Sequence, residues 1–128
     1  MTLLDRPDYM VGSDAIPVGG LVHPRAYGTF PRIVGRLRRR YGYPVEQVVQ
    51  RMTQNPAHRF GLAGRGEIKE GYRADICVFD PDLIIDLSSF EDPMLHPVGI
   101  PYVIVNGELV VDESVCTGVL PGDGIQAV

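Results

Sequence analysis

Hydrophobic and polar positions repeat with a helical period in the first half of the chain. From Phe30 to Tyr41, apolar residues recur three or four positions apart, so that they share one face of a helix. Pro31 is expected at the start of this helix, after Thr29, and Gly42 at its end. The opposite face carries arginines, which we interpret as a solvated surface: Arg32, Arg36, Arg39 and Arg40.

Two shorter helices are predicted to follow. Pro44 opens the first of them, and its apolar stripe comprises Val45, Val48, Val49 and Met52. Asn55 is expected to cap the second, because Pro56 at the first helical position needs no amide partner. The core-facing residues of this last helix would be Ala57, Phe60 and Leu62.

The pattern changes near Arg65, after which short apolar runs alternate with turn residues. Residues 76–79 and 83–85 are predicted as strands. The clearest local prediction is a hairpin, in which Asn106-Gly107 separates two runs rich in β-branched residues and favours the positive φ angles of a type I′ turn. The tail, residues 118–128, shows little periodicity, and we expect an extended strap or a frayed end.

The first element of the chain is a brief apolar run at residues 9–13. A stretch rich in glycine and proline follows it, from Gly12 to Pro24. We predict a buried strand that leads into a long loop.

Length and composition narrow the class of protein. The chain has 128 residues, of which 45% are hydrophobic, enough for one domain with a core. It is too short for a complete (β/α)₈ barrel, which needs roughly 200 residues. A net charge of -4 argues against a nucleic-acid partner. The two cysteines form no CxxC pair, so we expect both to stay reduced in the cytoplasm, and no apolar run is long enough for a membrane span.

Candidate chemistry is limited by what the chain lacks. Its three histidines, His23, His58 and His96, stand far apart and in no zinc-ligand spacing, and no GxSxG or Walker-type motif occurs. Asp14 is the carboxylate best placed for acid–base work, at the end of the predicted strand, although the pattern alone favours a turn-capping role. Arg25 could hold a substrate carboxylate, although a solvated loop arginine is the more common outcome.

Several segments together resemble the amidohydrolase superfamily, and most closely the N-acyl-D-amino-acid deacylases. The series that recurs across the superfamily includes Asn-Pro-Ala at residues 55–57, Ala-Asp at 74–75 and Asp-Pro at 80–81. Two segments are more specific for the deacylases: His-Pro-Arg-Ala-Tyr-Gly-Thr-Phe-Pro at residues 23–31 and Phe-Glu-Asp-Pro at residues 90–93. The resemblance spans nearly the whole chain.

This resemblance implies a fold and a chemistry. The family combines a (β/α)₈ barrel with a small β-sandwich and hydrolyses N-acyl-D-amino acids at a zinc centre. Asp14 matches the aspartate that moves a proton between water and the departing amine, with a possible weak role as a metal ligand. Arg25 and His23 are assigned to substrate binding, Arg25 to the α-carboxylate. Residues 1–64 would hold the last barrel strand and outer helices, and residues 65–128 the C-terminal half of the sandwich.

The family's main metal ligands have no counterpart in this sequence. We therefore expect an α+β fragment of a deacylase that binds no zinc and is inactive alone, and that acts on an N-acyl-D-amino acid only when the missing barrel completes it. It would form a homo-oligomer or pair with a missing N-terminal chain. The alternative is a non-catalytic binding or assembly module. A cyclic-amide substrate, such as a dihydropyrimidine, fits the segment around Arg25 less well.

Overall fold

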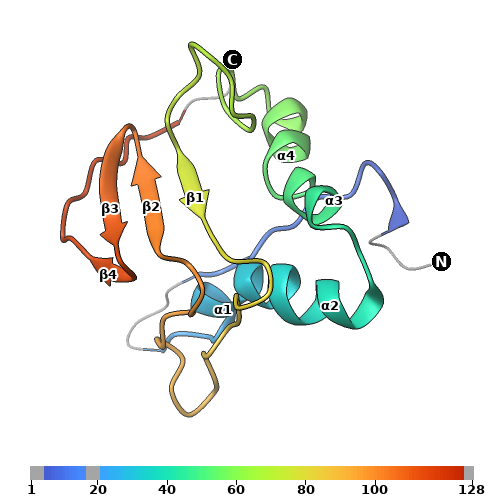
Figure 1. Cartoon of the computed structure of the whole chain (residues 1–128), viewed down its shortest axis with the longest axis vertical. Coiled ribbons are helices and arrows are strands. Elements are labelled where there is room, and N and C mark those ends of the chain that lie inside the picture. The colour runs from blue at the N-terminus through green and yellow to red at the C-terminus, as the bar shows by residue number, and fades with distance from the viewer. Residues whose placement is uncertain (1–4, 17–20, 126–128) are drawn as a thin grey trace.

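A computed structural model describes residues 5–16 and 21–125 of the chain. Residues 17–20 of the expected loop and 126–128 of the tail lie outside the described residues. Figure 1 shows the four strands on one side of the molecule and the helices on the other. The α+β class is confirmed, and the chain is no complete barrel. Within the described ranges, no helix is long and apolar enough to span a membrane.

The predicted first helix is present but begins earlier than expected. It consists of α1 (Arg25–Arg32), the π-helical turn η2 (Ile33–Leu37) and α2 (Arg38–Tyr41), and it ends at Gly42 with φ of 69°. Pro31 therefore lies inside the helix and not at its start. Because proline has no N–H, the regular hydrogen-bond ladder is interrupted there, and the wider π turn follows directly.

The arginine face of the helix is exposed, as predicted, but it also makes contacts that the pattern did not predict. The guanidinium of Arg39 donates hydrogen bonds to the carbonyl oxygens of Pro81, Asp82 and Ile84, at 3.1 to 3.2 Å. These three carbonyls belong to residues 79–101, which we call the returning segment. Arg32 and Arg36 bind the same segment at Asp86. The polar helix face is thus a contact surface, because an irregular segment offers unpaired carbonyl oxygens that arginine can satisfy.

The core is small and joins the helices to that returning segment. Val34, Val48 and Ile84 are its buried centre, each 5% exposed or less. The ends of the predicted stripe lie outside it, since Phe30 is 42% and Tyr41 55% exposed. Around the centre pack partly buried residues: Ile33, Tyr43, Met52, Phe79 and Ile100.

The two short helices occur close to their predicted positions. α3 spans Val45–Gln50, after Pro44, as expected. α4 spans Gln54–Arg59, so Asn55 is inside it and caps nothing. The Asn55 side-chain amide donates instead to the carbonyl oxygens of Pro7 and Tyr9, at 2.8 and 2.9 Å.

The expected core face of α4 was only partly correct. Ala57 is buried at 4% exposure, whereas Phe60 is 58% exposed. Phe60 follows the last residue of this short helix, where the backbone has left helical geometry, so its side chain no longer continues the buried face.

The sheet is antiparallel throughout, in the order β1-β2-β3-β4. The strands are β1 (Ile76–Val78), β2 (Tyr102–Val105), β3 (Glu108–Asp112) and β4 (Val115–Cys116). The predicted hairpin is confirmed, with φ of 49° at Asn106 and 84° at Gly107. Residues 83–85 form only an isolated bridge, between Ile85 and Val98. The two cysteine thiols, on the edge strands β1 and β4, are free.

The predicted strand at residues 9–13 does not form. This segment contacts the helices, with the Val11 N–H donating to the carbonyl oxygen of Arg51 at 3.1 Å. Arg51 is only 2% exposed and donates in turn to the carbonyl oxygen of Arg6. A strand needs a hydrogen-bonded neighbour, and in the described part of the chain the neighbours of a barrel strand are absent.

The hairpin turn allows a direct test of backbone geometry. Gly107→Ala is expected to destabilise the chain by about 1 kcal/mol, because an L-residue at positive φ is strained even though nothing lies within 4 Å of the new Cβ. Urea unfolding followed by circular dichroism measures the change. Gly122→Ala is the matched control, since Gly122 has equal space but no positive φ. Equal stability of the two variants would contradict the strained turn.

Candidate active site

Two of the predicted site residues lie together. Nη1 of Arg25 is 3.4 Å from Oδ2 of Asp14, and their side chains are 40% and 80% exposed. Asp14 has φ of 49°, in the left-handed region. A non-glycine residue there stores backbone strain, which is common at functional sites, although aspartate tolerates this conformation better than most residues. The loop thus presents an accessible carboxylate beside a guanidinium.

A turn-capping role for Asp14 stays a prediction, because its loop runs on into residues 17–20, which lie outside the described residues. Within residues 5–16 and 21–125, its carboxylate contacts Arg25 and accepts no backbone N–H. The Ala15 N–H donates to the hydroxyl of Ser13 instead, at 3.3 Å. The side chain of Asp14, 80% exposed, is accessible to a ligand.

His23 joins this pair through the backbone. Its Nδ1 accepts the backbone N–H of Arg25 at 3.0 Å. An imidazole nitrogen can accept only when it carries no proton, so this bond selects the tautomer protonated at Nε2. The His23 ring also meets the ring of Phe90 edge to face, with centroids 5.1 Å apart. His23 therefore acts as a helix-start acceptor for α1, and direct contact with substrate stays a prediction.

Arg25 retains one unused donor. Its Nε is buried and finds no hydrogen-bond partner among the described residues. A buried guanidinium donor without a partner is costly, and a ligand oxygen could satisfy it. The Nε–H is parallel to one N–H of Nη2, and these two donors form a fork that fits a carboxylate, while Nη1 faces Asp14.

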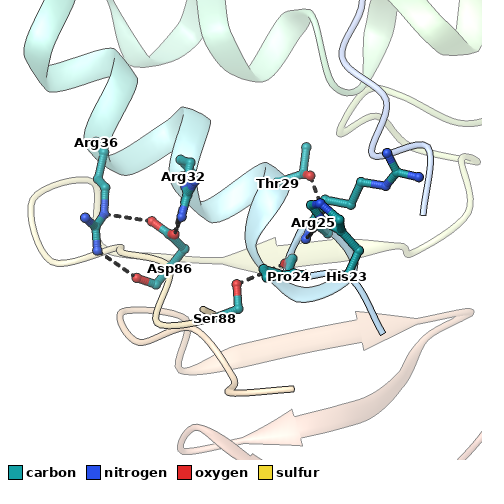
Figure 2. A network of polar contacts seen from close by, with 8 residues as sticks. All are labelled: His23, Pro24, Arg25, Thr29, Arg32, Arg36, Asp86 and Ser88. Carbon is teal, nitrogen blue, oxygen red and sulfur yellow. Dashed lines mark hydrogen bonds and ion pairs between the residues drawn. The ribbon is translucent and has the colours of Figure 1, made fainter. Parts of the chain in front are cut away.

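A buried polar network holds the start of α1 in place (Figure 2). Asp86, 1% exposed, binds Arg32 at 2.6 Å through Oδ2 and Arg36 at 2.8 Å through Oδ1. Ser88, 4% exposed, donates from Oγ to the carbonyl oxygen of Pro24 at 3.0 Å. A hollow of about 140 Å³ lies beside this network. The residues that line it include His23, Arg25, Ser88 and Phe90.

Sequence reasoning missed Asp86 and Ser88. The available signal was a single acidic residue within the apolar run Leu83-Ile-Ile-Asp-Leu87, a position where a buried charge needs a partner. That partner could not be read from the sequence, because Arg32 and Asp86 are 54 positions apart.

The described residues do not fit a zinc centre. They contain no group of three or more histidine, cysteine, aspartate or glutamate side chains close enough to share an ion. The Asp14 carboxylate faces Arg25, and Nδ1 of His23 is occupied by an N–H group. His58 lies 3.3 Å from Glu67, and His96 packs edge-on against Tyr27. Asp14 could supply one ligand at most.

Comparison with known proteins identifies the family. The amidohydrolase family model matches residues 1–111. The D-aminoacylase of Alcaligenes xylosoxydans xylosoxydans is 44% identical, over 91% of this chain and 26% of that protein. A crystal structure of D-aminoacylase superposes with a TM-score of 0.80 at 44% identity, covering 85% of this chain and 23% of the other.

A second solved structure agrees with the first. It is N-acyl-D-glutamate deacylase from Bordetella bronchiseptica, complexed with zinc and a phosphonate inhibitor that mimics the tetrahedral intermediate. Its TM-score is 0.79 at 44% identity, over 84% of this chain and 23% of the other. The chain thus spans about a quarter of the length of these relatives. On this evidence the chain belongs to the amidohydrolase family.

Proposed function

We propose that this chain carries the acid–base and carboxylate-binding part of a hydrolase that cleaves the amide bond of N-acyl-D-amino acids. The observation that carries the proposal is the adjacency of Asp14 and Arg25. In an N-acyl-α-amino acid, the carboxylate and the amide nitrogen are both attached to the α-carbon. Groups that bind these two parts of the substrate must therefore lie side by side.

Each residue has a distinct role in this proposal. The Asp14 carboxylate accepts a proton from water as the water oxygen bonds to the amide carbonyl carbon, and it returns the proton to nitrogen as the C–N bond breaks. The products are a carboxylic acid and a D-amino acid. Arg25 holds the α-carboxylate through the fork of its unused Nε and Nη2, while Nη1 stays beside Asp14.

Zinc binding requires ligands from outside the described residues. The relative from Bordetella bronchiseptica holds zinc, whereas the donor set described above offers a single carboxylate. We therefore infer that the 128-residue chain alone is inactive. Its exposed apolar side chains support pairing with the rest of a deacylase or with a second copy, as in the cases of Leu21, Ile68 and Leu120, each at least 85% exposed.

Complementation tests this function. The chain is mixed with the part of the Alcaligenes D-aminoacylase that it does not match, and hydrolysis of N-acetyl-D-leucine is measured with added zinc. We expect turnover from the mixture only, and none with N-acetyl-L-leucine. Asp14→Asn should lower the rate at least about 100-fold. Asp112→Asn, an exposed aspartate on β3, is the control and should change little.

Two results would contradict the proposal. Turnover by the isolated chain near an ordinary enzyme's rate, about 10 per second, would show that no outside ligands are needed. An Asp14→Asn mixture as active as the unaltered mixture would remove the acid–base role of Asp14.

A further inference from the structure

A segment distant in sequence contacts both residues that precede Arg25. The hydroxyl of Ser88 donates to the carbonyl oxygen of Pro24 at 3.0 Å, in a buried position. Phe90 meets the His23 ring edge to face at 5.1 Å, with the two planes at 78°. Figure 2 shows the Ser88 hydroxyl directed at Pro24 at the beginning of α1. The neighbouring residues His23 and Pro24 are thus both contacted by one segment, residues 88–90.

These two contacts reach Arg25 through its backbone. Nδ1 of His23 accepts the Arg25 N–H, so a tilt of the imidazole ring moves or breaks that bond. The Pro24 carbonyl oxygen also accepts the N–H groups of Tyr27 and Gly28, at 3.2 and 2.8 Å, in the first turn of α1. The position of the Arg25 backbone therefore depends on both His23 and Pro24.

The supporting segment is itself fixed. Two residues before Ser88, the Asp86 carboxylate is held between Arg32 and Arg36. On the helix side, Gly28 allows a close approach, because a Cβ there would overlap the Ser88 hydroxyl. Close packing on both sides therefore fixes how Ser88 meets the start of α1, and Phe90 follows two residues later.

We propose that Ser88 and Phe90 are positioning residues of the substrate-carboxylate site. They fix His23 and Pro24, and through them they set the direction in which Arg25 presents Nε and Nη2. This inference rests on the proposed role of Arg25 as the carboxylate-binding group. Bidentate binding tolerates little displacement, because a misplacement of about 1 Å separates one donor from its oxygen.

Nuclear magnetic resonance of the full 128-residue chain tests the proposal. With arginine labelled with ¹⁵N, the Arg25 Nε–H signal is followed during titration with N-acetyl-D-leucine. We expect Ser88→Ala and Phe90→Leu each to raise Kd about tenfold. Phe90 is 78% exposed, so Phe90→Leu should leave the fold intact.

Two control variants match these changes away from the site. Thr53→Val removes a hydroxyl that donates to the Val49 carbonyl oxygen, and Phe60→Leu shortens an aromatic residue that is 58% exposed. Neither control should alter Kd. A second readout is the pair of ¹⁵N signals of His23, which report the tautomer protonated at Nε2. They should change in Phe90→Leu and stay constant in both controls, which a general loss of stability would not produce.

The outcomes separate the two proposals. Unchanged Kd and unchanged His23 signals in Ser88→Ala and Phe90→Leu would overturn the positioning role while Arg25 still binds the carboxylate. If the Arg25 signal of the unaltered chain ignores N-acetyl-D-leucine, the proposed function of Arg25 fails. The positioning role is then decided by the His23 signals and the Arg25 backbone amide, which must still change in the two variants.

Discussion

Gly35→Ala is expected to destabilise the chain by about 3 kcal/mol. Helix propensity alone predicts the opposite sign, since alanine is favoured over glycine by about 1 kcal/mol inside a helix. Gly35, however, lies in the π turn, where a Cβ would overlap the backbone carbonyl oxygen of Ile84 and come within 3.3 Å of Arg39 Nη2. Overpacking against backbone forces the helix away from the core residue Ile84.

Urea unfolding measured by circular dichroism decides between these two effects. The control is Gly12→Ala, because nothing lies within 4 Å of a Cβ at that position. Its unfolding free energy should change by less than about 0.5 kcal/mol. A Gly35→Ala variant as stable as the unaltered chain would mean that the π turn does not press against the returning segment.

Asp86→Asn is the second substitution with a large expected effect, a loss of about 2 to 3 kcal/mol. The amide keeps the shape of the carboxylate but replaces one acceptor with an NH₂ group, which then faces an arginine. Arg32 and Arg36 lose a buried charge partner, although their side chains, 52% and 53% exposed, regain water and limit the loss.

The same substitution at Asp82 is the matched control. Asp82 is 88% exposed and lies 3.8 Å from Arg38, so Asp82→Asn should cost no more than about 0.5 kcal/mol. Chemical unfolding of both variants at low and moderate salt gives the comparison. If the two substitutions cost the same, Asp86 does not fix the segment that supports Ser88.

The ion pairs of Asp86 connect the stability of the fold to the candidate active site around Arg25. Arg32 lies in α1 and Arg36 in the π turn η2. Asp86 and Ser88 lie in the returning segment between β1 and β2. One carboxylate thus holds the same segment whose hydroxyl contacts Pro24. Loss of Asp86 should weaken both the fold and the placement of Arg25, whereas loss of Phe90 should affect the placement alone.

Local sequence determined the elements whose geometry depends on near neighbours. The three-to-four spacing of apolar residues predicted the helix that ends at Gly42, and Asn106-Gly107 predicted the hairpin, because φ preference and helical periodicity act within a few residues. The resemblance to the family followed from short motifs, among them the segment at residues 23–31 that contains His23 and Arg25, and it implied a role for Asp14. These residues lie close together in the sequence, at the loop before α1 and at its first residue, so their grouping was also a local property.

Tertiary structure alone decided what each polar face contacts. Periodicity placed arginines opposite the apolar stripe, but it carried no information on the segment 54 positions away that Arg32 binds. The strand expected at residues 9–13 needed barrel neighbours that the described chain does not provide, so it packs on the helices. Ser88 likewise contacts Pro24, 64 positions away, only because folding brings the two segments together. Contacts between distant segments depend on packing of the whole chain, whereas turns and helical faces depend on neighbouring residues.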